Sequence, residues 1–112
     1  WTAEYGDPND PKMAEVIARY SPYHNLDAGR TYPKVFFITS TRDDRVHPGH
    51  ARKMAAKMLS LGKPVHYFEN MEGGHAASAN QTQRAERTAL EFVYLWQQLD
   101  ASKAPTSSGP AK

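Results

Sequence analysis

The sequence contains no cysteine, so disulfide bonds and thiolate metal sites are excluded, and the redox compartment stays open. No apolar run reaches the roughly 20 residues that a membrane-spanning helix needs. The 14 lysines and arginines are scattered and the net charge is only +2, so no basic stripe predicts nucleic-acid binding. Because the chain starts at Trp1 without an initiator methionine, we expect further sequence upstream, and localisation, cytoplasmic or periplasmic, stays open.

The composition fits one domain at most, or a piece of one. Hydrophobic residues make up 39% of the 112 residues and charged residues 23%, as in a soluble globular chain with a thin core. A domain this small buries proportionately little surface and would be marginal if cut from a larger fold. We expect residues 1–100 to fold. Residues 101–112 are small, polar and proline-bearing, which predicts a disordered tail.

Local signals predict two short strands and three helices. Asp10 can cap a first helix that begins at Pro11 and that Ser21-Pro22 ends. The apolar runs PKVFFITS and PVHYFEN predict strands, and an amphipathic pattern follows each of them. The predicted strands are residues 33–40 and 64–70, and the later predicted helices are residues 50–62 and 80–99.

Each of the two later helices has an apolar face. The face of the helix at 50–62 consists of Ala51, Met54, Ala55 and Met58. Gly62 supplies its C-cap. On the helix at 80–99, the residues expected to turn inward are Ala85, Ala89, Phe92, Trp96 and Leu99.

This order of elements predicts the fold class. Strand–helix–strand–helix with short links is a βαβα unit, in which the strands run parallel and the crossover is right-handed. Two strands alone do not make a stable sheet. We therefore expect an α/β fold in which this unit closes one edge of a larger, doubly wound parallel sheet.

Both predicted strands are followed by a titratable residue. Asp43 lies three residues past Ser40, and His75 lies five residues past Asn70. The carboxyl ends of parallel strands meet at one edge of a sheet, about 4.8 Å apart, so we expect the two side chains within hydrogen-bond reach. A carboxylate that orients an imidazole is the supporting half of a Ser-His-Asp device. Glycines 73 and 74 would let the backbone turn sharply toward the site.

The stretches TRDDRVHPGHARKMA and EGGHAAS resemble the C-terminal end of the prolyl oligopeptidase family of serine peptidases. The likeness covers roughly residues 1–98. It implies an α/β-hydrolase catalytic domain, with triad residues in the chain order Ser, Asp, His. By this resemblance Asp43 is the triad acid and His75 the general base, and no metal or organic cofactor is required.

The resemblance also implies residues that bind the peptide substrate. Arg45 matches the arginine that hydrogen-bonds the backbone carbonyl upstream of the cleaved residue. The opening WTAEYGDP is similar to a family segment whose tryptophan stacks on the substrate proline ring. Trp1 would take that role, with Tyr5 and Val46 as further walls of the proline pocket.

The chain departs from the family in having no nucleophile motif. A serine in a G-x-S-x-G-type elbow is absent; Ser78 is near His75 in sequence but has no such flanking residues. The nucleophile, the oxyanion donors and the propeller that filters substrates are expected upstream, as the partner of this chain. We therefore predict that the chain supplies two triad residues and is inactive by itself.

Other interpretations stay open. Asp43 and His75 could be ordinary loop residues, since an Asp after a strand is often a turn residue. Asp44 fits a structural role, capping or pairing with Arg45. His47 and His50 have no third ligand at metal-site spacing, which favours surface residues at a helix start.

The function also has alternatives. Within the hydrolases, the chain could belong to an acylaminoacyl peptidase or an esterase. From a different class, it could be a non-catalytic structural or interaction fragment, stabilised by docking or by self-association through an exposed strand edge.

Overall fold

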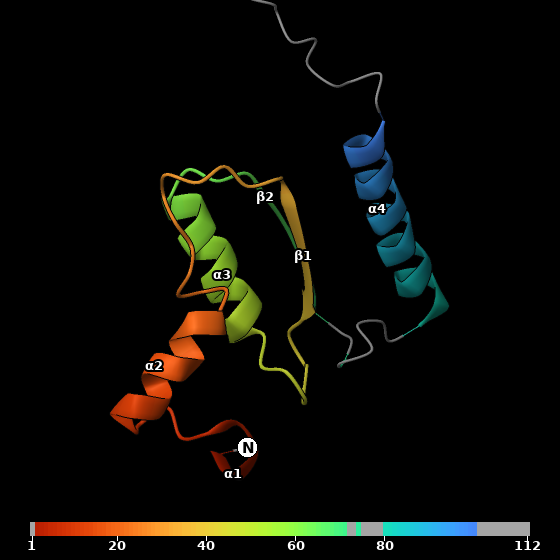
Figure 1. The fold of residues 1–112 in the computed structure, drawn as a ribbon. Helices are drawn as coiled ribbons and strands as arrows, with labels where there is room; N and C mark the ends of the chain where they lie inside the picture. The colour runs from red at the N-terminus through yellow and green to blue at the C-terminus, as the bar shows by residue number, and fades with distance from the viewer. Residues whose placement is uncertain (1, 72–73, 75–79, 101–112) are drawn as a thin grey trace, which may run out of the picture. The chain divides into compact units, whose positions relative to one another are not determined.

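A computed structural model describes residues 2–71, 74 and 80–100, and the described elements follow the order α1, α2, β1, α3, β2, α4 (Figure 1). The helices are α1 Thr2–Tyr5, α2 Pro11–Tyr20, α3 Gly49–Ser60 and α4 Gln81–Leu99, and the strands are β1 Val35–Ser40 and β2 Val65–Asn70. The single turn α1 was not expected from the sequence. The predicted tail at 101–112 lies outside the described residues.

The chain divides into two compact units. The first comprises Trp1–Ile38 and His47–Phe68, and the second comprises Thr39–Val46 and Glu69–Lys112. The Asp43 loop and α4 therefore belong to the second unit, whereas α1, α2 and α3 belong to the first.

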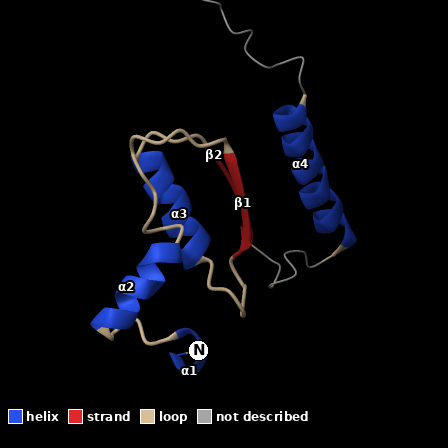
Figure 2. Ribbon diagram, in the orientation of Figure 1, coloured by secondary structure: helices blue, strands red, loops and turns tan. Residues whose placement is uncertain are grey.

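Strands β1 and β2 pair as a parallel sheet (Figure 2). The Val35 amide donates to the Pro64 carbonyl at 3.3 Å, and the Thr41 amide donates to the Asn70 carbonyl at 2.9 Å. In the second of these bonds, both residues lie six positions further along the chain than in the first, which defines a parallel pair. The crossover between the strands contains α3, so the predicted strand–helix–strand order with a parallel pair is confirmed.

The core of the first unit lies between α3 and β1. On α3, Met58 is 1% exposed and Ala55 is 5% exposed, which confirms the apolar face predicted for this helix. Met54 and Met58 line a pocket together with Val35 and Phe37 of β1. The apolar face of α3 therefore lies toward the first half of β1.

Helix α3 ends in a Schellman motif at Gly62. The Gly62 amide donates to the Leu59 carbonyl at 2.9 Å, and the Lys63 amide donates to the Met58 carbonyl at 2.9 Å. This arrangement requires a left-handed residue after the cap, and Gly62 has φ of 67°. The helix therefore stops where the sequence predicts, and the chain turns directly into β2.

Replacing Gly62 by alanine is expected to lower the free energy of unfolding by about 1 kcal/mol, measured by urea denaturation. No atom lies within 4 Å of an added Cβ, so the cost comes from the backbone conformation alone. The control is Gly29→Ala, where an added Cβ would stand 3.5 Å from Asp27 Oδ1 and φ is not left-handed. We expect that control to stay within about 0.5 kcal/mol of the wild type. Equal losses in both variants would contradict the argument.

Side-chain caps determine where α2 and α4 start. Asp10 Oδ1 accepts from the Lys12 amide at 3.0 Å, ahead of Pro11 in the first turn of α2. Asn80 Oδ1 accepts from the Gln83 amide at 2.9 Å and starts α4. Each cap satisfies an amide that the helix leaves without an internal partner. The Asn80 cap fixes where the chain enters α4 after the segment that contains His75.

The inward face predicted for α4 is wrong in this structure. Phe92 is 67% exposed, Trp96 73% and Leu99 77%, and Ala85 and Ala89 are exposed as well. The half-buried positions of α4 are instead Gln83, Arg87, Thr88, Glu91 and Tyr94. The physical reason is that the other described segments of the second unit are mostly polar and offer no apolar layer for the stripe to cover.

Candidate active site

Asp43 lies in a tight turn directly after β1, and its side chain holds that turn. Its Oδ1 accepts hydrogen bonds from the backbone amides of Arg45, at 3.0 Å, and Val46, at 2.8 Å. The Asp43 amide donates to the carbonyl of Ser40, the last residue of β1, at 3.2 Å. Aspartate favours such turns because its short carboxylate reaches amides a few residues ahead. The result is a half-buried carboxylate whose orientation is fixed by the surrounding backbone.

Polar contacts join the carboxyl ends of the two strands. The Asn70 carbonyl accepts from the Thr41 amide at 2.9 Å and from the Ser40 hydroxyl at 3.2 Å. The Thr41 hydroxyl donates to Glu69 Oε1 at 2.6 Å, a distance typical of a charged acceptor. These contacts fix the register at the edge from which both loops leave. They were not predicted; the available signal in the sequence is a polar residue at the end of each strand.

Gly74, the residue before His75, lies beside the Asp43 turn. A Cβ added at Gly74 would stand 3.7 Å from the carbonyl oxygen of Arg42, the residue before Asp43. A side chain at Gly74 would therefore contact the backbone that leads to Asp43, so the described residue before His75 lies near that turn. His75 itself lies outside the described residues.

The residues expected to bind substrate fall in different parts of the chain. Arg45 and Val46 share the Asp43 turn, and both side chains are exposed, Val46 to 50%. Tyr5 is in α1, is 55% exposed and belongs to the first unit. Trp1 lies outside the described residues. The structure therefore brings Arg45 and Val46 next to Asp43, whereas Tyr5 belongs to the other unit.

Residues 1–102 match the model of the prolyl oligopeptidase family. The chain belongs to this family. Among its relatives, the uncharacterized peptidase y4nA of Sinorhizobium fredii (strain NBRC 101917 / NGR234) is 54% identical over 103 residues, which cover 92% of this chain and 14% of that protein. Prolyl oligopeptidase ophP of Omphalotus olearius is 38% identical over 101 residues, covering 85% of this chain and 14% of that protein.

A third relative, the prolyl endopeptidase of Elizabethkingia miricola, is 38% identical over 87 residues, covering 74% of this chain and 12% of that protein. The chain thus spans 12% to 14% of the length of these three relatives. Membership in the prolyl oligopeptidase family confirms the resemblance drawn from TRDDRVHPGHARKMA and EGGHAAS. It places the chain among the peptidases, which are hydrolases, and the parallel strands with their helices are consistent with the fold of that family.

The structural role expected of Asp44 is taken by its neighbour. Asp43, not Asp44, accepts from the amides of the turn. Asp44 is exposed and makes no hydrogen bond or ion pair with another described residue. The two adjacent aspartates of this family member are therefore held very differently: Asp43 is ordered by the backbone, and Asp44 faces solvent.

The described residues offer no metal site at this edge. Across the described part of the chain, no group of three or more His, Cys, Asp or Glu side chains could hold a metal ion. His47 Nδ1 accepts from the Gly49 amide at 3.0 Å, so its ring caps the start of α3, as the surface interpretation expects.

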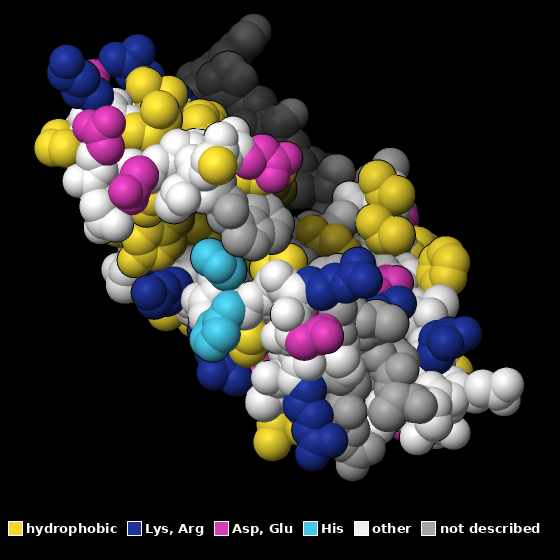
Figure 3. All heavy atoms as spheres, turned by 90° about the horizontal axis from the view of Figure 1, so that it is seen from below, with side chains coloured by type: hydrophobic (Ala, Val, Ile, Leu, Met, Phe, Trp, Pro, Cys, Tyr) yellow, Lys and Arg dark blue, Asp and Glu magenta, His cyan; other side chains and the backbone are white. Residues whose placement is uncertain are grey.

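On the face shown in Figure 3, Lys and Arg side chains lie among Asp, Glu and uncharged groups. Within the described residues, no helix is long and apolar enough to cross a membrane.

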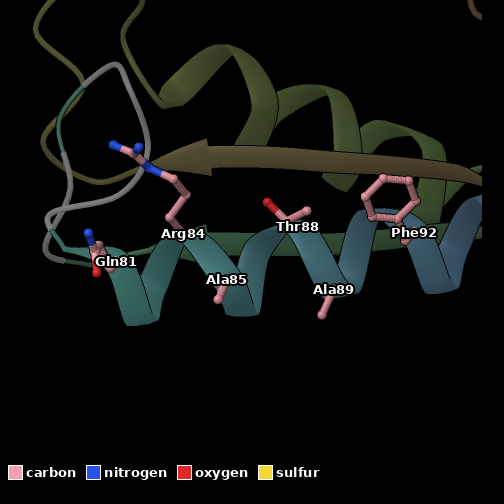
Figure 4. Close-up of a pocket in the computed structure, with 6 residues that line it drawn as sticks. All are labelled: Gln81, Arg84, Ala85, Thr88, Ala89 and Phe92. Carbon is pink, nitrogen blue, oxygen red and sulfur yellow. The ribbon is translucent and has the colours of Figure 1, made fainter.

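A pocket on α4 is a poor alternative site. Its lining residues are Gln81, Arg84, Ala85, Thr88, Ala89 and Phe92 (Figure 4). Arg84, Thr88 and Phe92 project from one side of the helix, and Ala85 and Ala89 from another. Arg84 is the one charged group among these six, so this lining lacks an acid–base pair. The pocket marks the exposed apolar stripe of α4 rather than a place for proton transfer.

Proposed function

We propose that this chain carries the acid and the base of a Ser-Asp-His triad in a serine peptidase that cuts oligopeptides after proline. Asp43 is the acid and His75 is the general base, while the serine comes from sequence outside this chain. The observation that supports this most is the position of Gly74 beside Arg42. It is what the triad needs, because the residues that precede acid and base then leave one edge of the sheet together.

The chemistry of this site is acyl transfer. His75 takes the proton from the serine hydroxyl as it attacks the peptide carbonyl, and then donates that proton to the leaving amine. Asp43 holds the imidazole in the required tautomer and stabilises the imidazolium that forms. The two amides on Asp43 Oδ1 support this role, since an acid that orients a base must itself be held in place.

Specificity for proline is assigned to three aromatic or apolar side chains and one cation. Arg45 hydrogen-bonds the substrate carbonyl upstream of the cleaved residue, and the Asp43 turn carries it next to the acid. Trp1 stacks on the proline ring, with Tyr5 and Val46 as further walls. In this proposal the chain closes one edge of an α/β-hydrolase sheet. Its partner is the rest of that catalytic domain, which supplies the serine and the oxyanion donors, and the chain alone is inactive.

The test uses the full-length protein that contains this chain. We expect it to react with a fluorophosphonate probe and to cleave a Gly-Pro reporter amide. Its kcat/KM should exceed that for the matched Gly-Ala amide by at least about 10-fold, because alanine lacks the methylene groups that fill a proline pocket. Pretreatment with the fluorophosphonate should abolish cleavage of both amides.

Each contrary outcome points to a different alternative. Equal rates on the proline and alanine amides, or a preference for an ester or an N-acylated amino acid, would place the protein with the acylaminoacyl peptidases or esterases. A protein that is neither labelled nor active would overturn the proposal and leave a structural fragment.

A further inference from the structure

Two polar residues are buried at the carboxyl ends of the strands. Ser40, the last residue of β1, is 2% exposed, and Asn70, the last residue of β2, is 8% exposed. A buried polar group is costly unless it is hydrogen-bonded, and these two are bonded to each other: the Ser40 hydroxyl donates to the Asn70 carbonyl at 3.2 Å. This bond uses the backbone carbonyl of Asn70, so the Asn70 side chain remains available for a contact of its own.

Asn70 extends this contact to α4. Its Nδ2 donates to Oε1 of Gln83, in the first turn of α4, at 3.2 Å. The bond joins two residues that lie 13 positions apart, and the segment between them contains His75. A direct side-chain bond thus ties together the two ends of the segment that carries the proposed base.

Ser40 connects the same contacts to the proposed acid. Its carbonyl accepts from the Asp43 amide at 3.2 Å, so the Asp43 turn starts from a residue that Asn70 holds. The chain of contacts therefore runs from Gln83 through Asn70 and Ser40 to Asp43, all within the second unit. Hydrogen bonds tolerate little change in distance or angle, which suits them to positioning.

We propose that Ser40, Asn70 and Gln83 form a polar clasp that positions Asp43 and the His75 segment relative to each other. This inference rests on the proposed function. The clasp residues are positioning residues and touch neither substrate nor serine. Their effect is on the distance between acid and base, which decides how well the imidazole is oriented when it removes the serine proton.

The central test replaces Gln83 by leucine in the full-length protein. The change removes the acceptor of Asn70 Nδ2 at similar side-chain size, and kcat per fluorophosphonate-titrated site should fall by roughly 10- to 100-fold. KM should change by less than about 2-fold, because the clasp makes no contact with the substrate. Gln83→Glu keeps an oxygen that can accept from Asn70 and should recover most of kcat.

Two further variants make the result specific. Gln98→Leu removes an exposed amide near the other end of α4 and should leave kcat unchanged. Asn70→Leu removes the donor, and the double variant with Gln83→Leu should lose less than the sum of the two single losses, because both changes break the bond between Asn70 and Gln83. A drop in kcat no greater than that of Gln98→Leu, additive losses, or no recovery with Gln83→Glu would each overturn the proposal.

Hydrogen exchange tests the clasp without any activity. In the full-length protein, peptides that cover residues 71–82 should take up deuterium faster in Gln83→Leu than in Gln98→Leu. Equal exchange in both would overturn the clasp even if the wild type is active. The wild type could also be neither labelled nor active, while exchange is still faster in Gln83→Leu. The clasp would then exist without the proposed triad, and its proposed role in catalysis would be overturned.

Discussion

Replacing Asp43 by asparagine in the full-length protein is expected to lower kcat by about 10⁴-fold with little change in KM. Asparagine has the same shape, and its side-chain oxygen can still accept from the amides of Arg45 and Val46, so the turn should survive. The nitrogen that replaces the second carboxylate oxygen cannot accept from an imidazole N–H and carries no negative charge. The variant therefore loses the correct tautomer of His75 and the stabilisation of the imidazolium. Steady-state hydrolysis of the Gly-Pro amide measures the effect.

The adjacent aspartate provides a matched control. Asp44→Asn makes the same chemical change one residue away, at an exposed carboxylate without a described partner, and should keep kcat within about 2-fold because surface changes are mild. Thermal unfolding of both variants separates lost chemistry from lost fold. If Asp44→Asn instead showed the large drop while Asp43→Asn did not, the acid would be Asp44, and the bonds to Asp43 Oδ1 would be those of an ordinary turn.

The ends of the elements follow closely from local sequence. Asp10, Gly62 and Asn80 mark helix ends through contacts within a few residues, so the sequence alone predicts them. The strands begin slightly later than expected, at Val35 and Val65; Pro64 directly precedes β2, and Pro33 lies two residues before β1. Proline has no amide to give to a ladder, which excludes it from the regular pairing.

The face of α4 could not be predicted, because it depends on more than the helix itself. The stripe from Ala85 to Leu99 has the spacing of a core-facing helix, yet Phe92, Trp96 and Leu99 are mostly exposed. A hydrophobic stripe shows that a helix needs an apolar partner, and it does not say which segment supplies one. In the described part of the second unit, the groups next to α4 are instead polar, such as Asn70 at Gln83.

For the site, the sequence predicts which residues matter but not what holds them. The position of Asp43 after β1 is visible in STRDDRVHPGH. The clasp was not visible, because the contact between Ser40 and Asn70 depends on the register of strands that are 30 residues apart. Register is a tertiary property, and a slip of one strand by one residue would turn the side chains of that strand to the other face.

Replacing His75 by alanine is expected to abolish fluorophosphonate labelling of the full-length protein, with a loss of kcat of roughly 10⁶-fold. The probe reacts with an activated serine, and without its general base the hydroxyl is a weak nucleophile. Labelling of the wild type and the variant is compared on a denaturing gel. The matched control is His50→Ala, an exposed ring on α3, which should label like the wild type.

The remaining histidines make His75 the informative choice. His24 is bonded to the Ser21 hydroxyl at 2.8 Å, His47 caps α3, and His66 packs edge-on against Phe36 with ring centroids 6.2 Å apart. These rings have structural partners, and their removal should act through stability rather than through the labelling rate. Full labelling of a folded His75→Ala protein would mean that the base lies elsewhere. Asp43 would then have no imidazole from this chain to orient, and the proximity of Gly74 to Arg42 would be a feature of the loop alone.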